Sequence, residues 1–124
     1  MTQAPPVDRA RVVRAATLLF GARRSNSKLP SLPADARPAS AAEAFAIQEE
    51  VTRLEGLPIG GWKVGLDPGV RFSFAPIYVP AVRESPAIIR SAGVSSLIIE
   101  AEVAFHLAAD LPVRDVPYTA AEVA

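Results

Sequence analysis

Two glutamates, Glu100 and Glu102, stand inside the most apolar stretch of the sequence, LIIEAEVAFHL, which spans 97–107. The alternation predicts a β-strand, whose side chains point to opposite faces with a period of two. Both carboxylates then share one face, with Cα atoms roughly 7 Å apart. Like charges at that separation repel and are costly to desolvate, and a cation between them removes both costs. Because Mg²⁺ suits carboxylate oxygens, we interpret the pair as metal ligands.

The same pair has a plainer explanation. One side of an antiparallel sheet often faces water, and Glu100 and Glu102 could simply be solvated there. The opposite face of the predicted strand is apolar throughout, so we expect Val103 and Phe105 to be buried. That face carries Leu97, Ile99, Ala101, Val103, Phe105 and Leu107.

Lys63 is the second candidate for chemistry. The chain has 11 arginines and only two lysines, and this lysine stands between Gly61 and Gly65 in a predicted strand. The glycines leave its face open to an approaching group. An ammonium can orient a carboxylate or, when desolvated, transfer protons, so we expect it to turn towards the glutamate pair. The alternative is a solvent-facing lysine beside structural glycines.

His106, the single histidine, shares a predicted strand face with the two glutamates. At strand rise it lies roughly 14 Å from Glu102, too far for both to ligate one ion from a straight strand. We therefore expect His106 to be neither metal ligand nor catalytic base. The sequence also has no nucleophile-elbow serine and no phosphate-binding loop.

Two helices are predicted ahead of the strands. Apolar residues at helical spacing indicate a first helix over 8–20, with Gly21 as its stop signal. Ser40 and Glu43 form a capping box that begins a second helix, which Gly56 ends. An irregular segment with three prolines separates the two helices. In the second helix we expect one apolar face and one outward charged face, formed respectively by Ala44, Ile47, Val51, Leu54 and by Gln48, Glu49, Arg53, Glu55.

Extended structure is predicted after residue 57. GWKVGL at 61–66 predicts a strand, and Asp67–Gly69 predicts a turn. The next segment can be an edge strand at best, because Pro76 and Pro80 interrupt it. A short strand and turn are expected over 85–96. Helices followed by strands predict the α+β class, with a helical region over 1–56 and a β-rich region over 57–124.

Composition excludes several classes of function. The chain has 124 residues, which suits one domain, and its 13 basic and 13 acidic residues give no net charge. That balance argues against a nucleic-acid partner and against a polybasic membrane-surface protein. The absence of cysteine excludes disulfides and zinc–thiolate sites, and no apolar run approaches the ~20 residues that span a bilayer. We expect a cytoplasmic protein.

The C-terminal residues predict a longer protein. Thr119 and Glu122 form another capping box, yet the sequence stops at Ala124, before two helical turns can form. We therefore expect an incomplete catalytic domain. The 124 residues alone are then expected to bind Mg²⁺ weakly, to show little activity and to associate.

Four sequence blocks, AEAFAIQEEV, GGWKVGL, IEAEVAFHLAADLP and YTAAEV, occur in this order between residues 42 and 123. Their order and spacing resemble the N-terminal part of the 2-keto-4-pentenoate hydratase branch of the fumarylacetoacetate hydrolase superfamily. Each block alone is weak, and the ordered set is specific. The chain departs from many hydratases near Pro80, where they carry an acidic residue. This departure leaves the exact reaction open.

The resemblance implies a mixed β-roll, of which residues 57–124 would form the first part, and a divalent metal, Mg²⁺ or Mn²⁺. It places the metal-binding glutamates at Glu100 and Glu102 and the catalytic lysine at Lys63. A third acidic ligand would come from a later segment. The implied substrate is a 2-oxo or enol acid, and the implied full-length protein is a homo-oligomer.

The implied activity is that of a metal-dependent hydratase-type lyase acting on 2-hydroxy-dienoic and 2-oxo acids. Relatives with the same site imply two alternatives, an acylpyruvate hydrolase and an oxalocrotonate decarboxylase. A third alternative is a truncated, non-catalytic fragment or an assembly partner.

Overall fold

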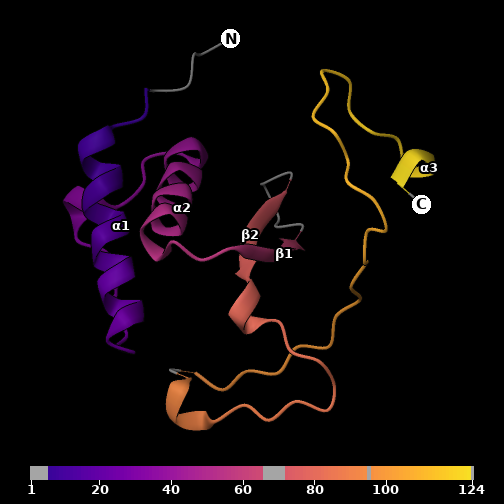
Figure 1. Ribbon diagram of the computed structural model, residues 1–124. Coiled ribbons are helices and arrows are strands. Elements are labelled where there is room, and N and C mark those ends of the chain that lie inside the picture. Colours follow the sequence, from indigo (N-terminus) through magenta and orange to yellow (C-terminus); the bar gives the residue numbers. More distant parts are fainter. Residues whose placement is uncertain (1–5, 66–71, 95, 124) are drawn as a thin grey trace.

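The computed structural model describes residues 6–65, 72–94 and 96–123 (Figure 1). Helices α1 and α2 lie side by side, and a β-hairpin follows α2. The chain beyond residue 97 runs as an extended trace on the other side of the hairpin. The described chain thus has α+β composition, as its sequence predicts, with helices α1, α2 and α3 and a two-stranded antiparallel sheet.

Helix α1 spans Arg9–Arg24 and begins after Asp8, whose carboxylate accepts hydrogen bonds from the amides of Ala10 and Arg11. The predicted stop at Gly21 is wrong, because the helix continues to Arg24. Its end lies where Asn26 adopts a left-handed conformation with φ 50°. Asparagine tolerates this conformation and here takes the role expected of glycine.

Helix α2 spans Ala41–Glu55 and has both caps that its sequence predicts. The Ser40 hydroxyl accepts a hydrogen bond from the Glu43 amide at 3.2 Å. At the other end, Gly56 is left-handed with φ 62°, a conformation that costs glycine little. Glu55, expected to face outward, instead turns its carboxylate towards α1, 3.5 Å from Arg23, and is largely buried.

The core lies between α1, α2 and the short turn η1 (Ala34–Ala36), which sits in the predicted irregular segment. Small side chains on α1 allow the helices to approach closely, and Ile47 and Val51 of α2 fill the interface. Ala44, expected on this face, is exposed. The buried apolar residues are Val12, Ala15, Ala16, Ala36, Ile47 and Val51.

Strands β1 (Ile59–Gly65) and β2 (Ser73–Tyr78) pair in antiparallel register. The predicted Lys63 strand is confirmed, and the proline-containing segment forms its partner. Phe45 of α2 stacks on Phe74 with ring centroids 4.6 Å apart, and Trp62 meets Phe74 edge-on. One face of the hairpin therefore contacts α2 through Phe74, and strand alternation puts Lys63 on the other face. The expected turn at 67–69 lies outside the described residues.

The predicted strand over 97–107 is wrong in this structure, because these residues form neither strand nor helix. Val103 and Phe105, expected in the core, are exposed. The short strand expected over 85–96 is also not formed in its described part, which instead contains the turn η3 (Ser91–Gly93). A strand needs ladder partners, and the described sheet pairs β1 with β2 alone.

The last described element, α3, spans Ala120–Val123 and follows the predicted capping box. Glu122 accepts hydrogen bonds from the amide and the hydroxyl of Thr119, at 2.7 and 2.9 Å. Another short turn, η2 (Val79–Ala81), follows β2 directly. Within the described ranges, no helix is long and apolar enough to cross a membrane.

Candidate functional site

Lys63, Glu100 and Glu102 come together in the structure. The Lys63 ammonium donates to Oε2 of Glu100 and to Oε1 of Glu102, so both carboxylates meet at one positive charge. The lysine comes from β1 and the glutamates from the extended segment beyond it. Although that segment forms no strand, both glutamate side chains reach the same ammonium. The glutamates thus converge as a cation site requires.

The electrostatics of this cluster, hereafter the Lys63 trio, follow from these contacts. Hydrogen bonds from Lys63 to Glu100 and then to Glu102 raise the pKa of the lysine above its ordinary range. Lys63 in turn lowers the pKa of Glu100. All three side chains remain about half exposed to water. In this arrangement Lys63 carries its proton at neutral pH, and Glu100 is ionised.

The glycines beside Lys63 differ in their surroundings. A side chain at Gly61 would meet nothing within 4 Å, so the strand is open there. A Cβ at Gly65 would lie 3.1 Å from the Ser73 hydroxyl oxygen on β2. Gly61 therefore leaves access next to Lys63, as expected, whereas Gly65 serves the close pairing of the two strands.

Other candidate features lie apart from the Lys63 trio. His106 is exposed and makes none of the contacts that define the trio. Two surface hollows, of about 490 and 240 Å³, are both lined by Leu19 and Arg23 of α1 and by no member of the trio. Among the described residues, no group of three histidine or acidic side chains could hold a metal ion. The Lys63 trio is thus an open site with two carboxylates.

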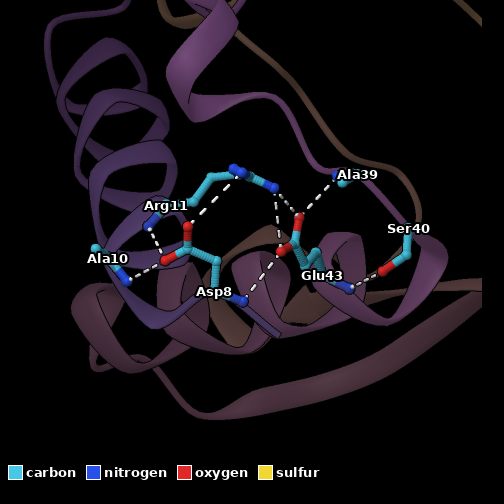
Figure 2. Close-up of polar contacts among 6 residues, drawn as sticks. All are labelled: Asp8, Ala10, Arg11, Ala39, Ser40 and Glu43. Atoms are coloured by element: carbon cyan, nitrogen blue, oxygen red, sulfur yellow. Dashed lines mark hydrogen bonds and ion pairs between the residues drawn. The ribbon is translucent and has the colours of Figure 1, made fainter. Parts of the chain in front are cut away.

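Figure 2 shows a second polar cluster, which is centred on Glu43. The sequence predicted only part of it. The Glu43 carboxylate accepts from the amides of Asp8, at 3.0 Å, and of Ala39, at 2.7 Å, and from Arg11. Glu43 as a whole is only 2% exposed. The capping box predicted its local contact with Ser40, but Asp8 and Arg11 lie more than 30 positions away. This contact set, the Glu43 clasp, joins the starts of α1 and α2.

The backbone amides of Ala39 and Asp8, followed by Arg11, hold the pKa of Glu43 below its ordinary value of 4.5. A carboxyl group whose pKa is lowered by folding stabilises the folded state above its unfolded pKa. That contribution is lost as the pH falls through the lower, folded pKa. Stability that depends on the Glu43 clasp should therefore decline in acid, starting near pH 4.5.

Glu43→Gln should lower the melting temperature at pH 7 by on the order of 5–10 °C, because it removes a buried charge from its donors. The difference from the native protein should shrink as the pH falls below 4.5 and through the lower pKa of folded Glu43, because the carboxyl group then becomes neutral, as the glutamine of the variant already is. Thermal unfolding followed by circular dichroism from pH 3 to 7 measures this. Glu49→Gln on the exposed side of α2 is the matched control, and an equal effect there would contradict the clasp.

Glu50 and Arg114 form further ion pairs that the sequence did not single out. Glu50 is largely buried and accepts from Arg53 and from Arg9 of α1. Arg114 makes two contacts of 2.8 Å with Glu122 and lies over the Tyr118 ring. Arg114 and then Thr119 lower the pKa of Glu122 to about 2. The Arg9 contact joins α1 to α2, whereas the Arg53 and Arg114 contacts link residues close together in the sequence.

The Lys63 trio is the candidate site with the clearest chemistry, since it combines a cation with two convergent carboxylates. By contrast, the Glu43 carboxylate already accepts hydrogen bonds from backbone amides and an arginine, and the Glu50 carboxylate accepts them from arginine. Comparisons of the chain with models of protein families, with curated proteins and with solved structures gave no significant match.

Proposed function

We propose that the Lys63 trio belongs to a metal-dependent hydratase-type lyase of the 2-keto-4-pentenoate hydratase kind, built on a mixed β-roll. Its substrates would be 2-hydroxy-dienoic or 2-oxo acids. The observation that carries this proposal is the convergence of Glu100 and Glu102, from one segment, on Lys63 of β1. The ordered sequence blocks around these residues support it independently.

The donor chemistry of the glutamate pair fits Mg²⁺ or Mn²⁺. Both ions prefer hard oxygen ligands, and Mg²⁺ is commonly held by one or two carboxylates together with water and substrate oxygens. One oxygen each of Glu100 and Glu102 already faces a common positive charge. These two residues would hold the ion, and the half-exposed surroundings leave room for water and for a substrate.

The chemistry divides between the ion and the lysine. When bound, a divalent ion supplies positive charge that stabilises an enolate as it develops. Lys63 would bind and orient the substrate carboxylate through its ammonium. The raised pKa of Lys63 in this structure suits binding of a carboxylate rather than transfer of a proton.

A second candidate, a non-catalytic assembly partner, is favoured by the exposed apolar side chains beyond residue 97. Ile99 is 90% exposed and Phe105 is 89% exposed, and their neighbours are similarly uncovered. Contiguous apolar surface of this kind marks contact with another protein. In this case the two ion pairs of the Lys63 trio would only stabilise the structure and would take no part in a reaction.

The two candidates are separated by assaying the purified chain, beside a version extended by any downstream reading frame, with 2-hydroxypenta-2,4-dienoate. We expect the extended version to consume the dienoate, seen as a fall in its absorbance, with Mg²⁺ or Mn²⁺, and we expect chelator to abolish this turnover. An acylpyruvate and an oxalocrotonate tested in parallel distinguish the related reactions. If neither version, although folded, turns over any of the three substrates, the enzyme proposal is rejected. Concentration-dependent association in sedimentation would then support the assembly partner.

A further inference from the structure

We infer that Lys63 is an internal counter-ion that holds the glutamate pair together and that a divalent metal must displace. The inference rests on the proposed metal site and concerns what happens to the lysine when that site fills. Its basis is the position of the ammonium, which contacts one oxygen of Glu100 and one of Glu102.

The ammonium occupies the place that a shared metal would need. A bridging metal requires oxygens of both carboxylates, and Lys63 is hydrogen-bonded to one oxygen of each. The Lys63 ammonium and a metal ion cannot both contact these two oxygens, because their positive charges would then lie close together and repel each other strongly. Binding of a metal by these same two oxygens and the Lys63 contacts are therefore mutually exclusive in the observed arrangement.

The surroundings of Lys63 also leave room for its side chain to move away from the two glutamates. Its side chain is about half exposed, and the neighbouring Gly61 offers no side chain to obstruct it. Once displaced, the ammonium stays on its strand within reach of the pair, where it can meet a substrate carboxylate. One residue would thus stabilise the metal-free site and bind substrate in the filled site.

Lys63 has a structural role in the metal-free chain as well. In the part of the chain that the structure describes, the hydrogen bonds joining residues 97–107 to the rest of the protein are the two from Lys63. Without a counter-ion the two carboxylates would repel each other. The lysine therefore keeps the ligands close together at the cost of competing with the metal for them.

Metal affinity tests this competition directly. Mn²⁺ binding, measured from the electron paramagnetic resonance signal of the free ion, is compared for the native chain, Lys63→Met and Lys28→Met. We expect Lys63→Met to bind Mn²⁺ about tenfold more tightly, because the competing charge is gone. Lys28→Met, with the same loss of charge at an exposed position remote in sequence, should leave the affinity unchanged.

A second measurement uses the unmutated chain. Because the chain has only two lysines, selective ¹³C,¹⁵N-lysine labelling gives two side-chain Cε signals, of which Lys28 is the internal reference. Titration with Mg²⁺ should shift the Lys63 signal and leave the Lys28 signal in place.

The outcomes separate this inference from the proposed function. If Lys63→Met binds Mn²⁺ equally or more weakly, or if Mg²⁺ binds without moving the Lys63 signal, the displacement of Lys63 by the metal is overturned and the metal site stands. If neither the native chain nor Lys63→Met binds Mn²⁺ at millimolar concentration, the metal site fails and the inference fails with it.

Discussion

Replacing both Glu100 and Glu102 with glutamine is expected to weaken Mn²⁺ binding at least about 100-fold. Loss of residues that merely support metal ligands already costs 10–100-fold, so removal of two direct ligands should cost more. Glutamine keeps the size and the polarity of each side chain but removes the charge that a hard cation requires. The expected result is therefore an almost complete loss of measurable binding with the fold intact.

Controls for this double variant must match its change in charge. Glu49→Gln combined with Glu84→Gln alters the net charge equally at exposed positions outside the trio, and it should leave Mn²⁺ affinity unchanged. His106→Gln should also leave it unchanged, since the exposed histidine lies outside the trio. Equal weakening in the Glu49 and Glu84 pair would mean that the metal responds only to overall charge. A loss in His106→Gln would make this histidine a ligand.

Ile47→Ala is expected to destabilise the folded state by about 2–5 kcal/mol, because it leaves a cavity between α1 and α2. Ile47 is 4% exposed and belongs to a core of six buried apolar residues among those that the structure describes. Since domains are typically stable by about 5–15 kcal/mol, this loss would be a large fraction of the total. The core between the two helices therefore carries much of the stability.

Urea unfolding followed by circular dichroism measures this change as a lower midpoint at unchanged slope. Ile88→Ala is the matched control, because it removes the same atoms from a side chain that is 89% exposed. It should change stability by less than about 0.5 kcal/mol. Equal effects of the two substitutions would show that the helix pair is not the main core.

The sequence predicts elements well where the signal is local. Both caps of α2 were identifiable, because Ser40 and Gly56 act on residues within one turn. Lys63 was also placed correctly in a strand. The end of α1 was missed because Gly21, a possible stop, costs a helix only about 1 kcal/mol, and Asn26 ends the helix instead.

Non-local features were harder to predict from the sequence. The alternation in 97–107 indicates which side chains would share a face, but it cannot supply the neighbouring strand that a ladder needs. The Glu43 contacts with Asp8 and Arg11 depend on how the two helices pack, and Glu55 turns inward for the same reason. The roles of Lys63, Glu100 and Glu102 remain predictions, although the structure brings these side chains together.

The Glu43 clasp has a consequence for the cooperativity of unfolding. One carboxylate accepts the amide of Asp8, just before α1, and the amide of Ala39, just before α2. Helix ends ordinarily fray independently, and their amides exchange hydrogen with water through separate small openings. Here the release of Glu43 exposes both amides in one event. The two helices, far apart in the sequence, thus begin to unravel as a single unit.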